Sequence, residues 1–293
     1  MLRSVAAALL LAAPLAASAQ AASAQNITAG EAFQKIQQRY GGPISGTTVD
    51  TLKAGDPATP VTGIATTFLD TMEVLREAAK RGDNLVITHE PTFYNHPDDT
   101  SFFQGDPVYE EKLAFIREHH MVVYRLHDEI HATKPDPIAI GLLKALGWEN
   151  DYKDNDPFFL TISPTTLGDL VSMLRTRLHI AVLPVIGDPN LKISHVAIRP
   201  GASGLQKQVL ALRRDDVDVL IAGEASQWET VEYARDAVAQ GRHKALILIG
   251  HEVSEEPGME ECAQELRAVF PGVRIDHIVA GQPWWNAEHP PAK

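Results

Sequence analysis

The chain has 293 residues, of which 44% are hydrophobic and 22% are charged. This balance is typical of a soluble globular protein with one large or two smaller domains. Its formal net charge of -12, from 38 acidic and 26 basic residues, argues against non-specific binding to nucleic acid or to an anionic membrane surface. Cations suit such a chain better than polyanions do.

The first residues have the pattern of a secretory signal peptide. A basic start at residues 1–3 precedes an apolar stretch, 5–17, that is too short to span a bilayer. Small residues suited to cleavage follow at 17–19 and again at 22–24. We therefore expect residues 1–25 to be a signal peptide and the protein to be periplasmic or secreted, with no stable membrane anchor.

From residue 26 onward, strand-like and helix-like patterns alternate, which is typical of an α/β protein with parallel or mixed sheets. In the first half the patterns predict strands over 62–69, 85–88 and 121–126, and helices over 28–40, 70–81, 109–119 and 137–146. Asp70 is expected to cap the second of these helices and Gly82 to end it. The stretch 46–60 is predicted to be a polar connection.

The second half repeats this alternation. Strands are predicted over 158–162, 180–186, 193–199, 217–222, 245–249 and 273–279, with helices between them, the last over about 259–270. We expect an N-terminal lobe over 26–150 and a C-terminal lobe over 151–293, joined at the polar segment 150–157 into one unit. Cys262 is the only cysteine, so no intrachain disulfide can form, and it is expected in the core.

Two apolar runs end directly in a histidine that has glutamates beside it. Residues 85–87 lead into His89 and Glu90, and residues 245–249 lead to His251, with Glu255 four positions later. Side chains just past the carboxyl end of a strand face the crevice where open α/β sheets bind ligands. Imidazole and carboxylate together suit zinc, iron or manganese. The recurrence predicts a metal site in the cleft between the lobes.

These motifs resemble those of the Nif-three-like family, named for an NGG-one-interacting factor and also known as type 2 homologues of GTP cyclohydrolase I. The resemblance covers nearly all of the chain after residue 25. The family's Thr-His-His-Pro is matched by residues 88–91, its His-Thr-Asn-Leu-Asp by 127–131, its Thr-Gly-Glu by 222–224, and its Gly-His-Tyr-x-Thr-Glu by 250–255. The resemblance implies an α/β fold of two similar lobes.

The resemblance also implies that two divalent metal ions bind, and it implies five ligands: His89, Glu90, His131, His251 and Glu255. Glu90 stands where the family has a histidine and His131 where it has an aspartate, so the total of three histidines and two carboxylates is kept. A carboxylate can bridge two cations and a singly bound imidazole cannot. Glu90 could therefore form the bridge; if it cannot reach, the site holds one metal.

Other residues near these motifs are candidates for supporting roles. Asp128, Glu129 and Glu224 are candidates for outer-shell or substitute positions. His127 follows a strand beside the second motif and is an open candidate for approaching the site.

The chemistry that such a site favours is hydrolysis of a small-molecule substrate through a metal-activated water. Glu224, or Glu252, is the candidate to move protons. GTP is not the expected substrate of an exported protein. The alternatives are a non-catalytic oligomeric protein that binds metal or acts as a scaffold, and a fold with a vestigial site. Resemblance to the family implies a homo-oligomer in the form of a hexameric ring.

Overall fold

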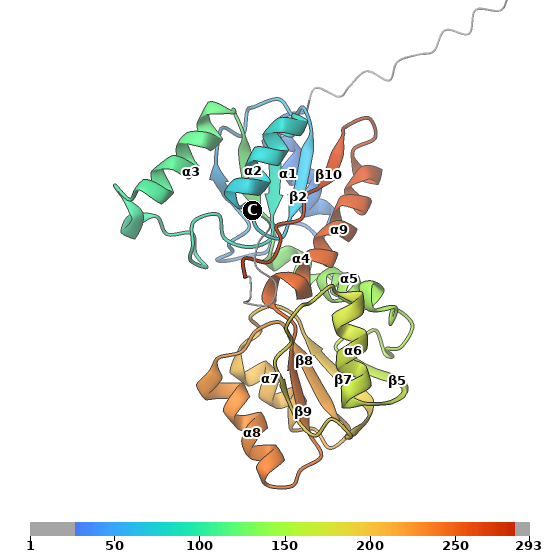
Figure 1. Ribbon diagram of the computed structural model, residues 1–293. Coiled ribbons are helices and arrows are strands. Elements are labelled where there is room, and N and C mark those ends of the chain that lie inside the picture. Colours follow the sequence, from blue (N-terminus) through green and yellow to red (C-terminus); the bar gives the residue numbers. More distant parts are fainter. Residues whose placement is uncertain (1–26, 285–293) are drawn as a thin grey trace, which may run out of the picture.

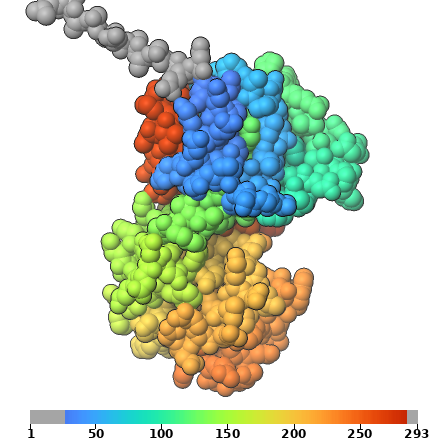
Figure 2. Space-filling view, turned by 180° about the vertical axis from the view of Figure 1, so that it is seen from behind, coloured from blue at the N-terminus to red at the C-terminus, as the bar shows by residue number. Residues whose placement is uncertain are grey.

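The computed structural model describes residues 27–284, which form two lobes, each built around a five-stranded sheet flanked by helices (Figure 1). Figure 2 shows the same two lobes from behind, with a narrower waist between them. The expected signal peptide, residues 1–25, lies outside the described residues. Within residues 27–284 no helix is both long enough and apolar enough to cross a membrane.

The first sheet has the strand order β1, β4, β3, β2, β10. Its strands are β1 Leu52–Ala54, β2 Ile64–Thr67, β3 Leu85–Thr88, β4 Val122–Arg125 and β10 Ile275–His277. All neighbours run parallel except β1, which is antiparallel to β4. Every residue of β2, β3 and β4 is buried, as expected of strands covered on both faces. Thr67, Thr88 and Arg125 are in register, so the residues after them meet at one edge.

The second sheet has the order β5, β7, β8, β9, β6. Its strands are β5 Phe159–Thr166, β6 Val185–Ile186, β7 Lys192–Arg199, β8 Val219–Ala222 and β9 Ala245–Leu248. The three central strands are parallel and the two edge strands are antiparallel to their neighbours. Arg199, Ala222 and Leu248 are in register at their carboxyl ends.

Helices cover both sheets and join them. They are α1 Ala29–Arg39, α2 Met72–Arg81, α3 Pro107–Glu118, α4 Asp128–Ala132, α5 Pro137–Leu146, α6 Leu167–Arg177, α7 Gly204–Leu212, α8 Glu232–Ala239 and α9 His251–Val269. A short 3-10 turn at Ser101–Phe103 and a π-helical turn at Gln227–Val231 complete the described elements.

The expected division into lobes over 26–150 and 151–293 is wrong at its second boundary, because the chain returns to the first lobe near its end. After β9, helix α9 packs on β2, β10 and α1 of the first lobe, and β10 pairs with β2. The first lobe is therefore made from both ends of the described chain. A local hydrophobic pattern indicates a strand but not its partner, so the sequence could not reveal this return.

Three local predictions were also wrong. Thr71, not Asp70, caps α2, because the Thr71 hydroxyl accepts from the Val74 amide, whereas buried Asp70 turns inward to Lys112 at 3.3 Å. The stretch predicted as a polar connection contains β1. Helix α9 begins at His251 and not near residue 259, and it continues through Pro257. Gly82 ends α2 in a left-handed conformation, as predicted.

Two glycines let α5 and α9 approach closely where the lobes join (Figure 1). A Cβ added at Gly141 would lie 2.5 Å from the Cα of Gly258, and one added at Gly258 would lie 2.6 Å from the Cα of Ile138. These contacts are with backbone atoms, which cannot move aside without shifting a helix. The two glycines therefore set the spacing between α5 and α9.

Gly141→Ala is expected to lower the free energy of unfolding by about 1–3 kcal/mol, because the added methyl group overpacks the helix contact. Denaturant unfolding followed by circular dichroism measures this. Gly168→Ala is the matched control, since a Cβ there meets no atom closer than 3.4 Å. Equal stability of the two variants would contradict the role given to the glycine contact.

Candidate metal centre

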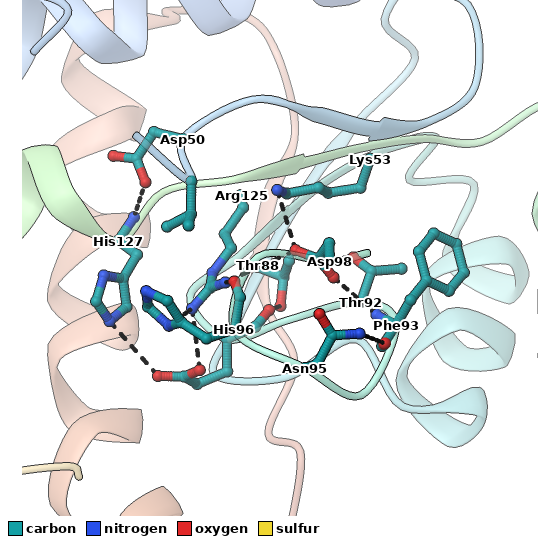
Figure 3. A network of polar contacts seen from close by, with 12 residues as sticks. Asp50, Lys53, Thr88, Thr92, Phe93, Asn95, His96, Asp98, Arg125 and His127 are labelled. Carbon is teal, nitrogen blue, oxygen red and sulfur yellow. Dashed lines mark hydrogen bonds and ion pairs between the residues drawn. The ribbon is translucent and has the colours of Figure 1, made fainter. Parts of the chain in front are cut away.

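Three histidines gather at the carboxyl edge of the first sheet. His89 follows β3, His127 precedes α4 and His131 lies one turn further along α4. One ring nitrogen of each lies within 4.8 Å of the others. Helix α4 forms here because Asp50 accepts hydrogen bonds from the amides of residues 127, 128 and 129 at its start. Figure 3 shows the bond from His127.

Each of these histidines has its Nδ1 held by an oxygen atom. The Nδ1 of His89 lies 3.0 Å from the carbonyl oxygen of Leu126, which can only accept, so His89 donates from this nitrogen. The Nδ1 of His127 lies 2.9 Å from Asp128, and that of His131 lies 2.9 Å from Asp136. This is the arrangement that orients histidine ligands of metals, since it leaves Nε2 free to bind. The Nε2 of His89 is fully buried and has no hydrogen-bond partner.

A second group of ligand atoms adjoins the first and shares His89 with it. His89, Glu90 and Glu255 offer ligand atoms within 4.8 Å of one another. The Oε2 of Glu255 lies 3.4 Å from the Nε2 of His89 and 3.0 Å from the Nε2 of His251. His251 and Glu255 are neighbours because they stand one turn apart at the start of α9.

The structure thus brings together all five residues that the sequence singled out as ligands and adds His127 to them. One side of the cluster offers three imidazoles, and the other offers two carboxylates with His251. These ligand atoms fit a divalent cation such as zinc, iron or manganese, and the buried Nε2 of His89, which makes no hydrogen bond, could bind one. A signal for His127 was present in the sequence, where it follows a strand as His89 does.

Of the supporting candidates on α4, Asp128 contacts a ligand and Glu129 does not. Asp128 orients His127 and also accepts from the hydroxyl of Thr48 at 2.9 Å. Glu129 is buried but accepts from Gln37 of α1 instead. Sequence reasoning missed Asp136 as the partner of His131, because residues 134–137 have the pattern of a turn and Asp136 also caps α5.

The electrostatics of the cluster place a proton on His251 and none on His127. Burial alone would lower the pKa of His251, but contacts with three carboxylates raise it to about 12; these are Glu224, Glu255 and Glu90. The pKa of Glu255 is held far below its usual range, despite burial, by His89 and His251. Burial, with His89 and His131 nearby, lowers the pKa of His127 to about 4. Before a cation binds, the proton on His251 offsets part of the carboxylate charge.

A cavity of about 1400 Å³ lies against this cluster. Five of the six candidate ligands line it, all except fully buried His89. From the second lobe, Arg199, Lys207 and Glu224 reach the same cavity, so it lies between the lobes. The Oε1 of Glu224 is 3.7 Å from the Nδ1 of His251, and its side chain is 58% exposed.

Metal binding is expected to release about one proton from His251 near neutral pH. The pKa of His251 is raised to about 12, so this side chain stays protonated through the range from pH 6.5 to 8.5, whereas a metal ligand must be neutral. Affinity should therefore rise roughly tenfold per pH unit over this range. Titration calorimetry in buffers of different ionisation enthalpy measures the release. His251→Ala should release about one proton fewer; equal release would contradict the assignment.

His127→Ala is expected to weaken metal binding by more than about 100-fold, because loss of a direct ligand should cost at least as much as loss of a supporting one. Competition with a chromogenic chelator measures the affinity. His195→Ala is the control, since His195 is exposed on β7 in the second lobe. If His127→Ala binds metal as tightly as that control, His127 is not a ligand.

Comparison with known proteins agrees with the fold and the motifs. The family model described as Duf34/NIF3 (NGG1p interacting factor 3) matches residues 44–282. A protein named GTP cyclohydrolase 1 type 2 homolog, from Clostridium acetobutylicum, is 25% identical over 230 residues, which are 75% of this chain and 81% of that protein.

Solved structures show the same fold. Staphylococcus aureus protein SA1388 superposes with a TM-score of 0.70 at 18% identity, over 89% of this chain and 99% of that one. A Bacillus cereus protein related to NIF3 gives a TM-score of 0.70 at 16% identity, with the same coverage of both chains. With the family model covering most of its length, this chain belongs to the Duf34/NIF3 family.

Proposed function

We propose that this protein is a metal-dependent hydrolase that acts on a small molecule through a water activated by two divalent cations. The observation that carries the proposal is the set of three imidazoles whose Nδ1 atoms each contact an oxygen. Two carboxylates, of Glu90 and Glu255, lie next to them, and a large cavity adjoins the cluster. Zinc, iron and manganese all suit these donors.

The cations would be held by His89, His127 and His131 on one side and by Glu90, His251 and Glu255 on the other; the ligand atom of His89 also lies within 4.8 Å of those of Glu90 and Glu255. When bound, such cations lower the pKa of a coordinated water and polarise a carbonyl or phosphoryl oxygen. Hydrolysis is the reaction that uses both effects.

Glu224 is the residue we assign to accept a proton from the water. Its contact with His251 holds the pKa of Glu224 below its usual range, so the carboxylate is ionised at neutral pH. It lies on the wall of the cavity, it comes from the second lobe, and its side chain is largely exposed. Glu252 is the second candidate, because burial and the nearby Glu256 raise its pKa to about 7, where it can both donate and accept.

The cavity favours an enzyme over a metal store or scaffold, because a store needs no space for a substrate beside its ligands. The Clostridium acetobutylicum relative is named for GTP cyclohydrolase 1, but we do not extend GTP to this chain. The proposal includes export and a homo-oligomer, expected as a hexameric ring. Export is supported by the sequence pattern of residues 1–25, and the ring by the family resemblance.

The direct test is to load the purified chain with zinc, iron or manganese and to screen carboxylic esters, amides, phosphate esters and cyclic amidines for hydrolysis. Turnover by the loaded protein and none by the chelated protein would support the proposal. Metal binding without turnover in any of these classes would favour the non-catalytic alternative.

Glu224→Gln is expected to lower kcat by about 10²–10⁴-fold while metal content stays unchanged, because the variant keeps its shape but cannot take up a proton. Steady-state kinetics and elemental analysis of the same sample measure the two quantities. Glu260→Gln, at an exposed position on α9, is the control. Equal kcat in the two variants would remove Glu224 from the mechanism.

A further inference from the structure

Arg125 is a fully buried cation directly behind the candidate metal centre. It is the last residue of β4 and has no exposed surface. Its Nε donates to the carbonyl oxygen of His89 at 2.9 Å, and its Nη1 donates to that of His96. Figure 3 shows His96 beside Arg125. Its Nη2 donates to the Oε2 of Glu90 at 3.1 Å.

A buried guanidinium needs negative charge beside it, and only two carboxylates within the described chain form ion pairs with Arg125. The Oδ2 of Asp98 lies 3.6 Å from Nη1, but it is closer, at 3.0 Å, to the Nζ of buried Lys53 (Figure 3). Asp98 therefore serves two cations. The carboxylate of Glu90 therefore supplies the negative charge that balances Arg125. This ion pair fixes the position of the Glu90 carboxylate.

The contact with Arg125 leaves Glu90 one oxygen for a cation. Its Oε2 faces Arg125, whereas its Oε1 lies 3.4 Å from the Nε2 of His251 and 3.7 Å from the Nε2 of His127. A carboxylate that bridges two cations with one oxygen on each uses both of its oxygens. The oxygen on Arg125 is not available for this while the ion pair is kept.

We propose that Arg125 is a positioning residue that restricts Glu90 to binding metal through Oε1 alone, so that Glu90 does not bridge two cations with one oxygen on each. The inference rests on the metal binding assumed in the proposed function. It excludes the bridge through both oxygens that the sequence left open for Glu90.

The test is titration of the full purified chain with Co²⁺, whose visible absorption reports the number and type of ligands. Arg125→Met should change this spectrum, because the freed Oε2 can join the coordination and raise the ligand number. It should also weaken Co²⁺ binding by about 10–100-fold, the usual effect of losing a residue that orients a ligand. Arg125→Lys, which can still donate to Oε2, should restore part of the wild-type spectrum.

Lys53→Met is the matched control, since it removes a buried cation from the same network without touching Glu90. It should keep the wild-type Co²⁺ spectrum. An unchanged spectrum in soluble Arg125→Met would overturn the inference, even if the wild type hydrolyses substrates. Conversely, the expected spectral changes in a protein without turnover would support this inference while the hydrolase proposal fails. If wild-type protein bound no Co²⁺, both would fall.

If Arg125→Met does not fold, a crystal structure of the wild-type protein loaded with Co²⁺ decides the question. One oxygen of Glu90 on the metal and the other on Arg125 would support the inference. Both oxygens of Glu90 on metal ions would overturn it.

Discussion

The close crossing of α5 and α9 at Gly141 and Gly258 is the contact on which the rest of the molecule depends. Helix α9 starts at the end of β9 in the second lobe and finishes against the first sheet. Its first turn carries His251 and Glu255 to His89 at the edge of that sheet. Because the glycine contact sets how closely α9 lies on α5, it also sets how closely these ligand atoms approach one another.

The candidate centre combines ligands whose positions have different causes. His89 is placed by a buried strand, and His127 and His131 are placed by a single short helix that Asp50 starts. Polar contacts also hold the ligand side chains in place. Each imidazole has an oxygen partner, and Glu90 accepts a hydrogen bond from Arg125. Such supporting contacts matter because a metal site tolerates little displacement of its ligands.

The sequence predicted the parts of this arrangement that are local. An apolar run that ends in a histidine predicts a strand with a side chain at its carboxyl edge, and this found both His89 and His251. It could not find Asp136, whose contact with His131 depends on how α4 leads into α5, nor Arg125, a buried charge at the end of an otherwise apolar strand. The pairing of β10 with β2 joins residues about two hundred positions apart, for which no local pattern exists.

Because the chain leaves the first lobe through α5 and re-enters it through α9, the second lobe is an insertion held by two adjacent helices. Glu224 and Arg199 are contributions of this inserted lobe to the cavity wall, whereas all the candidate metal ligands lie in the first lobe or on α9. Substitutions within the inserted lobe can therefore alter the wall of the cavity without replacing any candidate metal ligand.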